Sequence, residues 1–173
     1  MRPIVRVPLT YGVIGGVLGA GLTTALYYLG THPFLMDVYF DYRIVLFAIF
    51  IFFTLRELRD YHHDGILYFW QGLIASFIFV SAFAVIASLA IWLLAMSITE
   101  FVSSYITLSL ERLRNLPPEI VERIGKDVYE RNLEIIPSTN AADLAILYFG
   151  QCLIIGTFIS IILSVITRRQ PKP

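Results

Sequence analysis

Charged residues are scarce in this sequence. Lysine, arginine, aspartate and glutamate together make up 15% of the 173 residues, whereas soluble domains carry about 25%. Hydrophobic residues make up 57%, above the usual share of about 45–50%. A soluble protein with so little polar surface could not cover its core. The composition therefore excludes a soluble domain and favours an integral membrane protein.

Cysteine and a basic excess are lacking as well. Cys152 is the single cysteine, which excludes an internal disulfide and a cysteine-built zinc site. The 13 basic and 13 acidic residues cancel, so no global positive charge would attract nucleic acid. Nucleotide-binding and nucleophile motifs are also absent, and the glycine-rich stretch 12–21 has no preceding strand. We therefore expect no nucleic-acid partner, no cofactor, no metal and no enzymatic activity.

What the chain does contain is four apolar segments of membrane-spanning length. A crossing helix needs about 20 apolar residues to traverse a ~30 Å hydrocarbon layer. The predicted spans are residues 9–29, 38–55, 66–96 and 144–167. We expect one integral membrane domain over residues 1–173, of the all-α class, a polytopic bundle of four transmembrane helices. The third segment is longer than needed, so it would tilt or project beyond the bilayer.

Basic residues predict the orientation of these spans, because cytoplasmic loops carry an excess of lysine and arginine. We read the first segment as a retained helix, and four crossings then put the N-terminal tail, the turn after the second span and the C-terminal tail on one side. Both termini are therefore expected in the cytoplasm. The basic residues of these three segments are Arg2 and Arg6, Arg56 and Arg59, and Arg168, Arg169 and Lys172.

Residues 100–142 form the largest segment outside the predicted spans. The stretch "EFVSSYITLSLERLRNL" should continue the third helix until Pro117 and Pro118 break it. A second amphipathic helix should begin near Pro118, with Ile120, Ile124 and Val128 in one apolar stripe. This stripe could pack on the rim of the protein itself, or dock on a partner or on the lipid surface. The acidic balance of the segment disfavours attraction to anionic lipid.

Small residues recur at helical spacing in the first and last spans. Such stripes let two backbones approach closely, which holds helices together inside lipid. They could serve packing within one bundle or a contact with a second subunit. The predicted helix-packing residues are Gly12, Gly16 and Ala20, the neighbouring Gly15 and Gly19, and Gly156, Ser160 and Ser164.

Few polar residues fall within the predicted spans, although buried ionisable groups usually mark transport paths. Gln71 and Gln151 are the strongest polar residues there, and Arg43 lies near the start of the second span. Arg43 could pair with Asp41, and Glu100 could join them. Gln71, Gln151, Arg43 and Glu100 are therefore the candidates for a polar path, with snorkelling of Arg43 to the interface as the simpler interpretation.

The charged stretch "LRELRDYHHDG" separates the second and third spans. Its residues Asp60–Asp64 include two adjacent histidines and could in principle supply metal ligands. Adjacent residues point to different sides of a helix, however, and no spaced metal motif occurs. We therefore interpret the stretch as a hydrated turn with a helix restarting near Gly65.

Several of these stretches together resemble a known family. A basic tail leads into the glycine-rich first span, and "LRELRDYHHDG" precedes "ILYFWQGLIASFIFVSAFAVIASLAIWLL". A charged insert with "LPPEIVERI" follows, and the last span closes on "SIILSVITRRQ". This order resembles the small bacterial inner-membrane proteins of domain-of-unknown-function family 4199. The resemblance implies a four-span fold in a bacterial inner membrane, and it implies no activity or catalytic residues.

The functional expectation is a non-enzymatic integral membrane protein that acts through helix packing. It would be an accessory or assembly subunit, or a self-associating bundle, with the lipid bilayer and other membrane subunits or itself as partners. The alternative is a small oligomeric transporter or channel. A weaker alternative is a membrane enzyme that uses the Asp60–Asp64 turn.

Overall fold

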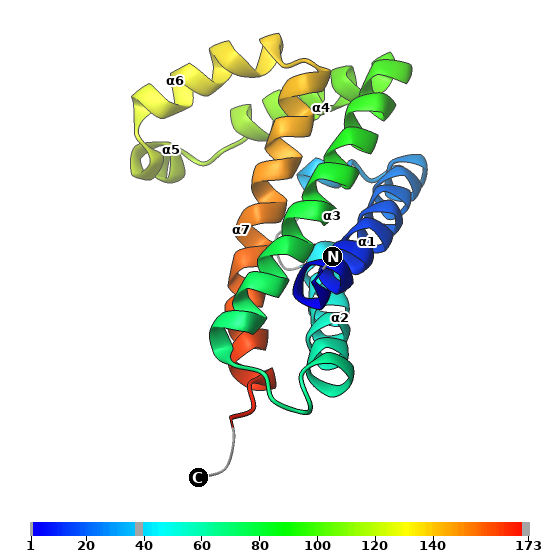
Figure 1. The fold of residues 1–173 in the computed structure, drawn as a ribbon. Coiled ribbons are helices and arrows are strands. Elements are labelled where there is room, and N and C mark those ends of the chain that lie inside the picture. Colours follow the sequence, from blue (N-terminus) through cyan, green and yellow to red (C-terminus); the bar gives the residue numbers. More distant parts are fainter. Residues whose placement is uncertain (1, 37–39, 171–173) are drawn as a thin grey trace.

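The computed structural model describes residues 2–36 and 40–170, and their regular structure is helical (Figure 1). This confirms the predicted all-α class. The elements in chain order are α1 Pro3–Tyr28, η1 Pro33–Leu35, α2 Tyr42–Glu57, the π-helical turn η3 Leu58–His62, α3 Phe69–Ser97, α4 Thr99–Arg114, α5 Pro118–Ile124, α6 Lys126–Ile135, η4 Ile136–Ser138 and α7 Ala141–Thr167.

Helix α3 is the centre of the bundle and packs along both α1 and α7. Helix α2 contacts α1, α3 and α7 and completes the bundle. Its Phe47 is fully buried, with its ring centroid 4.7 Å from that of Phe83 and 6.1 Å from that of Phe79, both on α3. These rings fill the middle of the bundle and hold α2 against α3.

The bundle has two distinct ends. At the terminal end, Leu67 exchanges two backbone hydrogen bonds with Arg169, so the start of α3 meets the end of α7. At the arm end, Tyr27 of α1 packs against Phe101 of α4, with ring centroids 4.9 Å apart. We call α4, α5 and α6 the arm. Figure 1 shows α6 and α5 reaching sideways from the bundle beyond the start of α7.

Three helices are long and apolar enough to cross a membrane, namely α1, α3 and α7. They correspond to the predicted spans 9–29, 66–96 and 144–167. Helix α2 matches the predicted span 38–55 in place, but it has only 16 residues, a rise of about 24 Å. Residues 38 and 39 of that predicted span lie outside the described residues.

Local chemistry accounts for the helix starts. Helix α1 begins at Pro3, earlier than predicted, because proline at a first helical position has no amide that needs a partner. Helix α7 begins at Ala141, after a reciprocal capping box. The Asn140 side chain accepts from the backbone N–H groups of Ala142 (2.8 Å) and Asp143 (3.2 Å), and the Asp143 side chain accepts from the Asn140 N–H (2.9 Å).

Two expectations about the arm were wrong. The third helix does not continue into α4, because Ile98 is extended (φ −122°, ψ 97°) and lets the chain turn so that Phe101 is buried. The segment from Pro118 is not one helix either, because Gly125 has φ +91° and separates α5 from α6. Only glycine adopts such a conformation readily. The break also divides the predicted apolar stripe.

The stripe is not buried against the bundle. Ile120 is 42% exposed, Ile124 39% and Val128 50%. Packing on the rim of the same molecule, one of the two alternatives that the sequence left open, thus leaves these side chains about half exposed. They remain on the surface of the arm.

The small residues of α1 lie in the contact with α3. A Cβ atom added to Gly12 would lie 2.7 Å from both the Ala82 Cβ and the Phe79 carbonyl oxygen. One added to Gly19 would lie 2.5 Å from the Phe83 ring. Gly15 and Gly16 are also buried, and Ala20 is partly buried. The close approach of two backbones thus occurs within one chain.

The stripe of α7 faces α3 in the same way. A Cβ atom on Gly156 would lie 2.5 Å from a methyl group of Val80. Ser160 is buried and donates to the Gly156 carbonyl oxygen at 2.6 Å. Ser164 is buried beside Gly72. Glycine and serine therefore set the spacing on both sides of α3.

Candidate functional site

A buried ion pair forms at the start of α2. Asp41 is the N-cap of the helix, and its carboxylate accepts from the backbone N–H of Arg43 at 2.9 Å. The Arg43 side chain donates back to the same carboxylate, at 2.8 Å from Nε and 2.6 Å from Nη2. The two side chains are only 10% and 8% exposed. One aspartate thus caps the helix and neutralises the arginine.

The same arginine joins α2 to α7. Its Nη1 donates to Oε1 of Gln151 at 2.9 Å. Its guanidinium carbon lies 4.9 Å from the ring centroid of Tyr148, a cation–π distance. The structure therefore brings together two of the candidate polar residues, Arg43 and Gln151, which are far apart in the sequence.

Three hydroxyl groups extend this cluster toward α1. The hydroxyls of Tyr42 and Tyr148 are 3.0 Å apart, and the Thr23 hydroxyl contacts that of Tyr42. Thr23 also donates to the Gly19 carbonyl oxygen at 2.8 Å. The polar cluster thus links α1, α2 and α7 near the arm end, and a cavity of about 240 Å³ lies beside Asp41, Arg43 and Gln151.

The other candidates for a polar path lie elsewhere. Gln71 is at the terminal end, where its Oε1 accepts from the Tyr68 N–H at 3.1 Å and caps α3. Glu100 lies on α4, beside a separate cavity lined also by Tyr27 and His32. Between Gln71 and the Arg43 cluster, the bundle is filled by buried Phe47 and its aromatic neighbours. The four residues do not line one route.

The Asp60–Asp64 stretch forms ion pairs and a turn. Arg59 donates to Asp60 at 2.7 Å, and Arg56 lies 3.5 Å from the same carboxylate. The hydrogen bond from Arg59 lowers the pKa of Asp60 below its ordinary value. Asp64 and Gly65 both have positive φ and form the turn. Within residues 2–36 and 40–170, no group of three or more His, Cys, Asp or Glu side chains could hold a metal ion.

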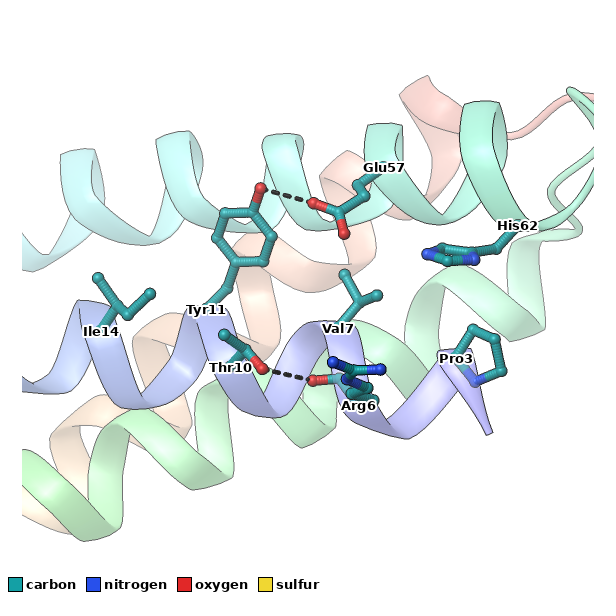
Figure 2. A pocket seen from close by; sticks show the side chains of 8 residues that line it. All are labelled: Pro3, Arg6, Val7, Thr10, Tyr11, Ile14, Glu57 and His62. Carbon is teal, nitrogen blue, oxygen red and sulfur yellow. Dashed lines mark hydrogen bonds between the residues drawn. The ribbon is translucent and has the colours of Figure 1, made fainter. Parts of the chain in front are cut away.

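A second polar region is a groove between α1 and the end of α2, at the terminal end (Figure 2). The groove encloses about 560 Å³. Tyr11 of α1 donates to Oε2 of Glu57 at 2.7 Å across it. It is lined by Pro3, Arg6, Val7, Thr10, Tyr11, Ile14, Glu57 and His62.

Sequence reasoning missed both the hydroxyl cluster and this groove. Tyr148 precedes Gln151 by three residues, so a shared helical face could have been anticipated. Tyr42 is adjacent to Arg43 and gave no comparable signal. The groove depends on the pairing of α1 with α2, which residue spacing within either helix does not encode.

Comparison with known proteins adds a family but no function. No curated protein and no solved structure matches the chain. A family described as "protein of unknown function (DUF4199)" matches residues 10–169, which cover the bundle and the arm. The chain therefore belongs to the DUF4199 family, as its resemblance in sequence indicated.

Proposed function

We propose that this protein is a non-enzymatic membrane protein of four crossings that serves as an accessory or assembly subunit of a larger membrane complex. The observation that carries the proposal is the arm, which exposes Ile120, Ile124 and Val128 outside the bundle. Exposed apolar side chains gathered on an otherwise charged segment are typical of a docking surface. A partner protein at the arm end would cover them.

The interior of the bundle supports a structural role over transport. Phe47, Phe79 and Phe83 are fully buried between the two polar regions. The glycine stripe of α1 packs against α3. It is therefore not available as a contact surface for the self-association that a small oligomeric channel would need. Transport remains the second candidate, favoured by the buried Asp41–Arg43 pair, because ionisable groups inside a bundle often mark ion paths.

A bacterial inner membrane with both termini in the cytoplasm is part of the same proposal. The terminal end carries Arg2, Arg6, Arg56, Arg59 and Arg168, which favours the cytoplasmic side. Four crossings require the 16 residues of α2 to span, and the bilayer can thin around a short helix.

Gentle extraction from the native membrane, followed by the intact mass of what elutes, tests the proposal. We expect a defined complex with other polypeptides. The variant Ile120→Ser, Ile124→Ser, Val128→Ser should release the protein from that complex without changing its own melting temperature. The control variant Glu119→Gln, Arg123→Gln alters the same arm at unchanged net charge and should stay bound.

The opposite outcome is equally clear. If the wild-type protein elutes alone or as a homo-oligomer, the accessory role is refuted. Ion and solute flux into liposomes is then the measurement for the transport candidate. Sealed liposomes that show no flux across a panel of ions would refute that candidate too.

A further inference from the structure

The groove between α1 and α2 combines three kinds of lining in a fixed order along α1. Pro3, Arg6, Thr10 and Ile14 lie at spacings of three and four residues, so they form one strip along the helix. The eleven helical steps from Pro3 to Ile14 correspond to about 16 Å of helix rise. Figure 2 shows Pro3 and His62 at one end, Arg6 beside Val7 and Thr10 at about the level of Glu57, and Ile14 beyond Tyr11 at the other end.

The outermost part of the groove is basic. Arg6 on α1 and His62 on η3 are both exposed, and both line the groove. In the described residues, Arg6 makes no ion pair with a carboxylate of this chain. The first turn of α1 adds the positive end of its dipole. This part suits a phosphate group.

The middle of the groove accepts hydrogen bonds. Glu57 is half-buried, and Oε2 receives the Tyr11 hydroxyl at 2.7 Å. Among the described residues, no hydrogen bond is made to its other oxygen, Oε1, and no cation is paired with it. A ligand hydroxyl at this depth could donate to Oε1, whereas a second phosphate or an ester carbonyl would be repelled.

The inner part of the groove is apolar and opens to the outside of the bundle. Ile14 is 49% exposed, and it continues into the exposed apolar surface formed by Val17 and Leu18. Val7 is buried in the wall. A volume of about 560 Å³ is within the range of roughly 300–1,000 Å³ that small-molecule sites occupy. One hydrocarbon chain can leave the groove along this surface.

From this order we propose that the groove binds a lysophospholipid, a single-chain lipid with a phosphate and a free glycerol hydroxyl beneath it. Arg6 and His62 bind the phosphate. Glu57 accepts the free hydroxyl, and the chain follows Ile14 toward Val17. A diacyl phospholipid fits worse because its second ester replaces the hydroxyl that Glu57 would accept, and its second chain needs more room. This site lies at the terminal end, away from the arm, so it does not depend on the proposed partner.

Native mass spectrometry of the full-length protein, purified in a maltoside detergent, tests the site. The probes are palmitoyl lysophosphatidic acid, the matching dipalmitoyl phosphatidic acid, which has no free hydroxyl, and inorganic phosphate and glycerol 3-phosphate as competitors. We expect one bound lysolipid per chain, weaker binding of the diacyl lipid, and no displacement by millimolar concentrations of either soluble phosphate. Displacement by either soluble phosphate at millimolar concentration would identify a soluble ligand and overturn the lipid assignment.

Variants locate the binding. Arg6→Gln and Glu57→Gln should each weaken lysolipid binding about tenfold, the effect of one lost charge-assisted hydrogen bond. Arg2→Gln is the control for basic charge, because Arg2 does not line the groove, and it should bind like the wild type. Tyr11→Phe frees Glu57 Oε2 and should bind at least as well as the wild type. Unchanged affinity in both Arg6→Gln and Glu57→Gln, with melting temperatures intact, would refute the site, as would no bound lysolipid on the wild type.

Discussion

At the scale of single residues, glycine decides how closely α1 and α3 approach. A methyl group on Gly12 would meet the Ala82 Cβ and a backbone oxygen, each at 2.7 Å, and neither can move aside cheaply. We expect Gly12→Ala to lower the free energy of unfolding by about 1–3 kcal/mol, as overpacking does. Gly21→Ala on the same helix is the matched control, because its Cβ would meet nothing within 4 Å. Thermal unfolding in detergent measures both, and equal losses would contradict the packing argument.

The Asp41–Arg43 pair is the second feature that belongs to the residue scale. Asparagine at position 41 would still cap α2 but would leave the buried Arg43 without its counter-charge. We expect Asp41→Asn to destabilise the protein by about 3 kcal/mol, the usual cost of breaking a buried pair from one side. Asp60→Asn should have little effect, because its pair with Arg59 is open to solvent. Chemical unfolding in detergent measures both variants. A larger loss of stability in Asp60→Asn than in Asp41→Asn would show that water or a lipid phosphate replaces Asp41 as the partner of Arg43.

At the scale of elements, His32 connects η1 and α4 at the arm end. It is 7% exposed, and its Nε2 donates to the Phe101 carbonyl oxygen at 3.2 Å. Burial disfavours the charged imidazolium and lowers the pKa of His32 below its ordinary value of 6.5, although the hydrogen bond partly opposes this. Tyr27 and Glu100 line the cavity beside it. The neutral ring therefore favours docking of α4.

The sign of the pH effect follows from this lowered pKa. As the pH falls below about 6.5, the unfolded chain takes up a proton at His32 before the folded protein does, so stability is lost. We expect the melting temperature to fall between pH 7 and pH 5.5 in the wild type and to fall less in His32→Gln. His62→Gln, at an exposed position at the other end, should keep the wild-type profile. Identical profiles for the wild type and His32→Gln would remove His32 as the cause.

Element boundaries show how far sequence reasoning reaches. The apolar runs predicted α3 and α7 to within three residues, because about 20 consecutive apolar residues leave a helix few alternatives, whereas α1 begins six residues before the predicted span. The breaks at Ile98 and Gly125 were not predicted. Isoleucine gives no breaking signal, and its extended backbone serves the burial of Phe101, a contact distant in sequence. Gly125 lies within an otherwise regular apolar pattern, and that pattern favoured the prediction of one continuous helix despite the glycine.

For the candidate residues too, sequence reasoning predicted features within one helix but not contacts between helices. Small residues at helical spacing predicted positions that the folded chain buries against α3, because spacing within one helix determines which face they share. Arg43 and Gln151 were singled out one at a time, and their contact arises only from the packing of α2 on α7. Gln71 and Glu100 were chosen by the same criterion and lie apart from them. Polarity within an apolar run thus identified candidate residues but not their partners.

At the scale of the whole molecule, the topology of the bundle depends on whether α2 crosses the membrane. Its 16 residues are short for a span, but the buried Asp41–Arg43 pair lets its polar start lie within the bundle, and the bilayer can thin around a short helix. The start of α1 and the end of η3 lie at the same end of the bundle, because Pro3 and His62 line the same groove. If the bundle is embedded as one unit, α2 must cross with the others.

Labelling single cysteines with a membrane-impermeant maleimide checks this topology. Cys152 is buried, so Cys152→Ser provides a background without reactive thiols. With four crossings, Arg2→Cys and Asp64→Cys should react from the same side of the membrane, in inverted vesicles, and Glu122→Cys should react in intact spheroplasts. If α2 instead turned back without crossing, positions 2 and 64 would react from opposite sides. The groove between α1 and the end of α2 could then not form in a membrane-embedded chain. Comparing the labelling of positions 2 and 64 therefore tests the topology and the lipid site together.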